Sequence, residues 1–117
     1  MTAPDAVERY YDAWINRKGD MTHVPLAEDF TFVGPVGSFD SPEGFRAMAA
    51  QFGPIAQDFT VRHQFSDGDL VCSIVEWHLP QVPGTTTAAE LLTVEHGALV
   101  RAEVIYDGEQ LRKLAAG

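Results

Sequence analysis

The chain has 117 residues, with 17 acidic against 8 basic side chains and a formal net charge of −9. This length predicts one domain, over residues 1–117, and the ordinary share of apolar residues predicts that it folds. Nucleic acids and anionic membranes attract clustered lysine and arginine, which this sequence lacks, so we expect neither as a partner. The single Cys72 cannot form an internal disulfide, and no signal peptide or membrane-spanning run is recognisable, so we expect a cytoplasmic protein.

The first half of the chain predicts three helices. Residues 7–15 repeat apolar side chains at three- and four-residue spacing, which indicates a helix that stops at Gly19. Asp20 is expected to start a short second helix, which Pro25 keeps short. Ser41 and Pro42 combine a cap with a proline at the first helical position, so a third helix is expected from there to Gly53-Pro54.

Strand patterns separate and follow these helices. Residues 30–33 alternate as in a strand, which ends at Gly34-Pro35. Four further runs begin near residues 59, 70, 85 and 98, and tight turns are expected at Asp67-Gly68 and His96-Gly97. This order predicts an α+β fold: a curved antiparallel sheet wrapped as a cone around N-terminal helices, with an internal apolar pocket.

Three stretches carry a family resemblance: VERYYDAWINRKGD, AEDFTFVGPVGSF and ELLTVEHGALVRAEVIYD. Together they resemble the SnoaL-like branch of the nuclear transport factor 2-like superfamily, over nearly the whole chain. The resemblance implies a conical, cystatin-like fold with an internal apolar pocket and, commonly, a homodimer built on the outer sheet face. Members include ketosteroid isomerase, scytalone dehydratase, limonene epoxide hydrolase and polyketide cyclases, so the fold does not fix one reaction.

The local match to ketosteroid isomerase is the closest of these. Its D-P-V-G segment carries the general base before the proline, whereas this chain has GPVGS, with Gly34 at that position. Because glycine cannot take a proton, the resemblance does not carry that mechanism over. Matching V-x-R-Y places the family's hydrogen-bonding tyrosine at Tyr10, and its acidic oxyanion partner falls near Glu90 or Leu91.

Glu90 is the main acid-base candidate, because it lies in a strand with few other charges. If it faces an apolar pocket, burial raises its pKa towards neutrality, where it can donate or accept a proton. If instead a regular ladder follows the turn at His96-Gly97, Glu90 pairs with Glu103 on the outer face, near Arg101. The sequence leaves both arrangements open.

His63 is the second candidate, because it shares an apolar strand face with Phe59 and Val61. The alternative is a hydrogen-bonded core histidine. No group of His, Asp and Glu has metal-ligand spacing, so we expect no metal. Some aromatic residues should fill the core, and we expect six to line the pocket: Trp14, Phe32, Phe45, Phe52, Trp77 and Tyr106.

The resemblance and the candidate residues predict a SnoaL-like small-molecule protein with an apolar pocket and leave two functions open. The first is a cofactor-independent enzyme, for which the resemblance implies an isomerase, cyclase, dehydratase or epoxide hydrolase type. It would act on a small hydrophobic cyclic molecule, with Glu90 or His63 moving the proton and Tyr10 or Tyr106 holding the oxyanion. The alternative, favoured by Gly34, is a module that binds a hydrophobic ligand or dimerises without catalysis. A homodimer is expected from the resemblance and from apolar positions assigned to the outer face: Leu92, Val94, Leu99 and Ile105.

Overall fold

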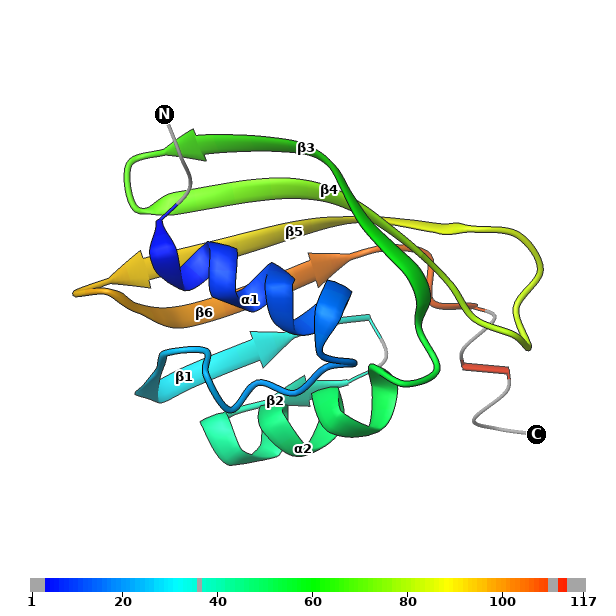
Figure 1. Cartoon of the computed structure of the whole chain (residues 1–117), viewed down its shortest axis with the longest axis horizontal. Helices are drawn as coiled ribbons and strands as arrows, with labels where there is room; N and C mark the ends of the chain where they lie inside the picture. Colours follow the sequence, from blue (N-terminus) through cyan, green and yellow to red (C-terminus); the bar gives the residue numbers. More distant parts are fainter. Residues whose placement is uncertain (1–3, 36, 110–111, 114–117) are drawn as a thin grey trace.

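The computed structural model describes residues 4–35, 37–109 and 112–113 (Figure 1). Within these residues, no helix is long and apolar enough to cross a membrane. The elements in chain order are α1 (Asp5–Asn16), β1 (Leu26–Val33), β2 (Ser38–Phe39), α2 (Pro42–Phe52), β3 (Gln57–Asp67), β4 (Leu70–His78), β5 (Thr86–Glu95) and β6 (Ala98–Ile105).

The six strands form one curved sheet in the order β2-β1-β6-β5-β4-β3 (Figure 1). The pairs β3–β4, β4–β5 and β5–β6 follow one another in the chain and run antiparallel. β1 and β6 are far apart in the chain, and this pair is parallel. The sheet is therefore mixed, where the sequence predicted antiparallel pairing throughout. The predicted α+β cone is confirmed, and the two helices lie on the same face of the sheet (Figure 1).

The core joins both helices to β1. Phe45 of α2 is fully buried, and its ring centroid lies 5.1 Å from those of Phe30 and Phe32. The ring of Tyr10, from α1, stacks on the other side of Phe45 at 6.2 Å. These contacts place the helices against the concave face of the sheet. They also leave the ends of α1 and α2 free to frame a cavity.

The predicted second helix is absent. Residues 20–24 form turns instead, because the carboxylate of Asp20 accepts a hydrogen bond from the backbone N–H of Thr22, at 3.0 Å. The side chain of Arg46 donates to the carbonyl oxygens of Met21 and Val24, which holds the segment against α2. Pro25 then leads directly into β1, which begins earlier than the alternation of residues 30–33 predicted.

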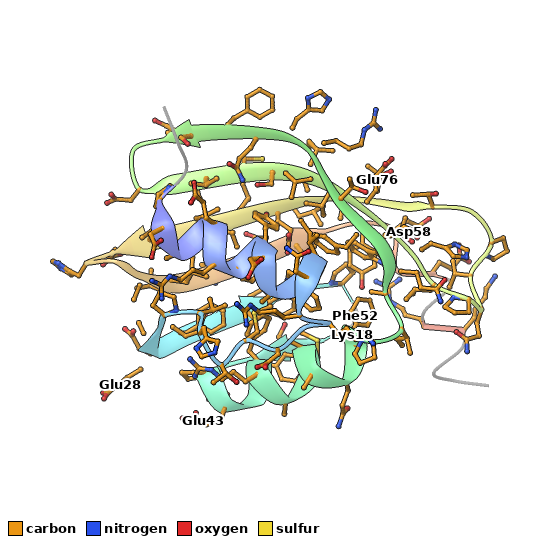
Figure 2. The ribbon with its side chains drawn as sticks, viewed as in Figure 1. Lys18, Glu28, Glu43, Phe52, Asp58 and Glu76 are labelled. Atoms are coloured by element: carbon orange, nitrogen blue, oxygen red, sulfur yellow. The ribbon has the colours of Figure 1, made fainter. Side chains whose placement is uncertain are left out.

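The third predicted helix is confirmed as α2. The hydroxyl of Ser41 accepts a hydrogen bond from the backbone N–H of Gly44, as expected of a cap. At the other end of α2, a Cβ on Gly53 would lie 2.0 Å from the carbonyl oxygen of Lys18. The absence of a side chain at Gly53 therefore lets α2 end against the α1–β1 connection, and Figure 2 shows Phe52 and Lys18 side by side there.

Of the register shifts in the sheet, two bulges decide which faces the candidate site residues occupy. In β3, Val61 lies opposite Val75 but His63 lies opposite Ile74, so Arg62 is the extra residue. In β6, Leu99 lies opposite Val94 but Arg101 lies opposite Thr93, so Val100 is the extra residue. Beyond each bulge, the side chains change faces relative to a regular ladder.

The second bulge overturns most of the predicted outer-face positions. Leu92, Val94 and Leu99 are buried on the concave face, and Ile105, which is 54% exposed, is the one of the four on the outer face. The turn at His96-Gly97 does form, with φ of 51° and 78°. The first hairpin differs by one residue from the prediction, because Asp67 pairs with Leu70 and leaves Gly68-Asp69 as its loop.

Candidate functional site

A cavity of about 590 Å³ lies between the helices and the concave face of the sheet. It occupies the end of the cone where α1 and α2 finish, β3 begins and β4 and β6 end. The residues that line it are Trp14, Phe32, Gly34, Gly37, Phe39, Met48, Phe52, Phe59, Trp77, Glu90, Val104, Tyr106 and Arg112. This lining is mainly aromatic, which suits a small apolar ligand.

Aromatic rings from four elements pack into one wall of the cavity. The ring planes of Trp14 and Trp77 lie within 11° and 6° of the plane of Phe59, with centroids 5.8 Å and 6.1 Å away. Phe52 meets both indoles edge-on at 6.1 Å, and Tyr106 meets Trp77 edge-on at 5.3 Å. Such mutual contacts hold the rings in fixed positions and give the cavity a rigid wall.

Glu90 contributes the carboxyl group of the cavity. It is 4% exposed, and the phenol of Tyr10 donates a hydrogen bond of 2.8 Å to its Oε2 atom. Burial raises the pKa of Glu90 to about 7, against the opposing effects of that hydrogen bond and of the neighbouring Tyr11 phenol. Its Oε1 atom is buried without a hydrogen-bond partner among the described residues. A carboxyl group with this pKa is present in both protonation states near neutral pH, and its Oε1 atom has unused hydrogen-bonding capacity.

Tyr10 supports Glu90 from α1 and does not itself line the cavity. Its ring is fully buried, and burial together with the neighbouring Glu90 raises the pKa of its phenol well above the ordinary value. The phenol thus stays protonated and donates to the carboxyl group. Tyr10 is therefore a group that positions the acid, whereas the resemblance implied contact with the oxyanion.

The bulge at Val100 explains why Glu90 faces inwards. A regular ladder from the two-residue turn would have set Glu90 opposite Glu103, but the extra residue sets it opposite Val104. On the other side, Glu90 lies opposite the buried Ser73 of β4. Of the two arrangements that the sequence left open, the structure has the inward one.

The rim of the cavity carries Tyr106 and Arg112. Burial raises the pKa of Tyr106, and the positive charge of Arg112 opposes this shift. The exposed guanidinium of Arg112 donates a hydrogen bond of 3.1 Å to the carbonyl oxygen of Pro35, in the β1–β2 loop. The rim therefore offers polar hydrogen-bond donors, while the carboxyl group lies deep.

His63 lies outside the cavity, so the prediction that it shares the pocket face is wrong. The bulge at Arg62 moves it to the outer face of the sheet, where it is exposed and its ring stacks against Phe65 with centroids 6.4 Å apart. Gln64 takes the inward position instead and donates a hydrogen bond to Ser73 at 3.1 Å.

Among the six aromatic residues predicted to line the pocket, Phe45 is the exception, because it is sealed in the core by Tyr10, Phe30 and Phe32. The other five line the cavity: Trp14, Phe32, Phe52, Trp77 and Tyr106. Five further residues line the cavity without having been predicted from the sequence: Phe39, Met48, Phe59, Val104 and Arg112. Phe59 and Met48 belong to apolar faces that the sequence does show. The bulge at Val100 changes the face on which Val104 lies, and β2, with two residues, is too short for an alternating pattern that would assign Phe39.

Comparisons with known proteins place the chain in a family. No curated protein matches it, but the family model of the SnoaL-like domain matches residues 7–102. A structure from Kribbella flavida DSM 17836 superposes with a TM-score of 0.82 at 26% identity, over 97% of this chain and 93% of that one.

Two further neighbours share the fold at lower identity. A ketosteroid isomerase-like protein from Catenulispora acidiphila DSM 44928, in complex with trimethylamine, has a TM-score of 0.73 at 18% identity, over 90% of this chain and 87% of that one. A proposed polyketide cyclase from Sinorhizobium meliloti has a TM-score of 0.75 at 17% identity, over 88% and 95%. With most of its length matched by the family model, the chain belongs to the SnoaL-like domain family.

Proposed function

We propose that the protein catalyses a proton transfer on a small hydrophobic cyclic molecule, with Glu90 as the acid-base group. The observation that carries this proposal is a carboxyl group with a pKa of about 7 on the surface of an aromatic cavity. Near neutral pH such a group is present in both protonation states, so it can take a proton from one carbon or oxygen and return it to another. Isomerisation, cyclisation and dehydration all need this step.

The other polar groups of the cavity take supporting roles. Tyr10 orients Glu90 through the 2.8 Å hydrogen bond and favours its ionised form. Tyr106 lines the cavity and is the phenol placed to donate to an oxygen on which negative charge develops. The chemistry requires no cofactor. The proposed polyketide cyclase and the trimethylamine complex among the fold neighbours support a small-molecule ligand.

A second candidate is a protein that binds such a ligand without changing it. Gly34 favours this function, because it lines the cavity where ketosteroid isomerase has its base. Among the described lining residues, Glu90 is then the one carboxyl group. A reaction that needs a separate acid and base would have to draw the second group from Tyr106 or from the substrate.

The test begins with a thermal-shift screen of steroid enones, aromatic polyketides, terpene epoxides and fatty acids. A ligand at about 100 times its dissociation constant adds about 2.7 kcal/mol to the free energy of unfolding, which gives a visible shift. Compounds that bind are then tested for turnover with the wild type, Glu90→Gln and, as control, Glu95→Gln, which changes an exposed acid at the end of β5.

We expect Glu90→Gln to lower kcat by about 100-fold or more while the ligand still binds, because general acid-base catalysis contributes at least that much. The control should keep wild-type turnover. Full turnover by Glu90→Gln would contradict the assignment, and binding without turnover by the wild type would favour the second candidate.

We also propose that the protein is a homodimer through the outer face of the sheet. Two rows of residues run across the strands on that face. One consists of Ile74, Ala89 and Ile105, and the other of Phe65, Cys72 and Leu91. Phe65 is 63% exposed and Ile105 54% exposed. Large apolar side chains exposed on one sheet face suit burial against a second copy, as the family resemblance implied.

A further inference from the structure

The polar groups of the cavity are segregated by charge. Glu90 lies deep, and Arg112 lies at the rim with Tyr106. Among the described lining residues, Arg112 is the one that carries a positive charge, in a chain whose formal net charge is −9. A ligand that lies along the cavity therefore meets a carboxyl group at one end and a guanidinium at the other.

The guanidinium of Arg112 has hydrogen-bond donors that no described residue accepts. Arg9, Arg17, Arg62 and Arg101 each form an ion pair with a carboxylate, whereas Arg46 and Arg112 have none within ion-pair distance among the described residues. Arg46 donates to two backbone carbonyl oxygens away from the cavity, so Arg112 is the unpaired guanidinium among the described lining residues. Its one described hydrogen bond, to the carbonyl oxygen of Pro35, uses one of five guanidinium N–H donors. That bond fixes the guanidinium against the β1–β2 loop, whose Gly34 and Gly37 also line the cavity, and leaves donors for an anion.

The aromatic wall restricts the shape of the ligand. Five of the lining residues are the mutually packed rings Trp14, Phe52, Phe59, Trp77 and Tyr106, so the ring system of an aromatic ligand finds apolar contact along this wall. A volume of about 590 Å³ accommodates two or three fused rings with a substituent. An anionic group is disfavoured at the deep end whenever Glu90 is ionised, because it would meet a second negative charge there. It can lie at the rim, where Arg112 compensates its charge.

We propose that the cavity binds planar apolar acids, with the rings on the aromatic wall and the anionic group against Arg112 at the rim. This inference names the ligand class for the proposed function and rests on the same cavity. It places the uncharged end of the ligand beside Glu90, where proton transfer would occur.

The test compares three ligands that share the naphthalene ring: 2-naphthoate, the nearly isosteric 2-naphthamide, and the bulkier trimethyl-(2-naphthyl)ammonium cation. Isothermal titration calorimetry gives their dissociation constants for the wild type, Arg112→Gln and Lys113→Gln. The control removes the same charge from the adjacent residue, which pairs with the exposed Glu109. The two tryptophans of the chain both line the cavity, so shifts of their indole N–H signals in NMR spectra locate the ligand.

We expect the wild type to bind naphthoate about five- to tenfold more tightly than naphthamide, because a charged hydrogen bond at an exposed rim contributes about this much. Arg112→Gln should remove this preference and leave the amide affinity unchanged, whereas Lys113→Gln should keep it. Added salt should weaken the preference.

Three results would overturn the proposal: equal binding of acid and amide by the wild type, equal loss of both in Arg112→Gln, or no binding of any of the three. Tightest binding of the cation would show that Glu90 and the aromatic rings, and not Arg112, select the charge. None of these measurements depends on turnover. An inactive protein that prefers the acid would refute the proposed catalysis alone, and an active one that prefers the amide would refute this inference alone.

Discussion

Replacing Glu90 with glutamine should stabilise the protein above neutral pH and have little effect in mild acid. The native state holds the Glu90 proton up to a pKa of about 7, whereas an ordinary glutamate loses it near 4.5. Between these two values the unfolded chain is ionised and the native carboxyl group is not, so the native state binds one more proton. The free energy of unfolding of the wild type therefore falls as the pH rises through this window and is constant above it. Glutamine has nearly the same shape, accepts the Tyr10 hydrogen bond and does not titrate.

The size of the effect follows from the pKa difference. One pKa unit corresponds to about 1.4 kcal/mol, so a shift from 4.5 to about 7 corresponds to about 3 kcal/mol above neutrality. Part of this is already present at about pH 5, because the unfolded glutamate is then mostly ionised. The stability difference between Glu90→Gln and wild type should therefore grow by about 2–3 kcal/mol between about pH 5 and about pH 8.

Urea unfolding, followed by circular dichroism at several pH values, measures this difference directly. Glu95→Gln is the matched control, because it removes an exposed acid from the same strand and should show no comparable pH-dependent gain. If the difference between Glu90→Gln and wild type is the same at both pH values, Glu90 titrates like an exposed glutamate. The argument for its acid-base role would then fail.

Two further predictions test the framework around the site and the outer face. Gly53→Ala places a Cβ 2.0 Å from the Lys18 carbonyl oxygen and should lower the free energy of unfolding by about 1–3 kcal/mol or more. The control Gly37→Ala, whose added Cβ would have its nearest neighbour 3.9 Å away, should lower it less. Equal losses would refute the close packing of α2 on the α1–β1 connection. Ile105→Asp should convert a dimer to a monomer in sedimentation at micromolar concentration, while Ile55→Asp, at a 48% exposed site away from the sheet, should not. A monomeric wild type would contradict the proposed dimer.

The elements that the sequence predicted well are those whose cause is local. The cap at Ser41 needs only residues three positions apart, and the turn at His96-Gly97 needs only a residue pair that tolerates positive φ. The failed helix at Asp20 also has a partly local cause, since an Asp side chain can close a turn with its own backbone. The sequence could not show that Arg46, from a distant helix, would hold that turn.

The orientations of the candidate catalytic residues have a cause that the sequence does not display. A bulge adds one residue to a strand, and neither Arg62 nor Val100 differs in type from an ordinary strand residue. Each nevertheless reverses the face assigned by simple alternation. The first moves His63 out of the cavity, and the second brings Glu90 into it, which is why the sequence left the position of Glu90 open.

The cavity and its carboxyl group argue together against a purely structural role. A cone that served only to dimerise would gain stability from a filled interior, yet about 590 Å³ is left between the helices and the sheet. Glu90 adds an ionisation cost of about 3 kcal/mol above neutral pH, which an apolar residue at the same position would avoid. Such costs in one place are typical of sites that bind and transform a ligand. The proposed dimer face, made by Ile105 and its neighbours on the opposite side of the sheet, would require neither the cavity nor the acid. A pocket function is therefore the explanation that accounts for both.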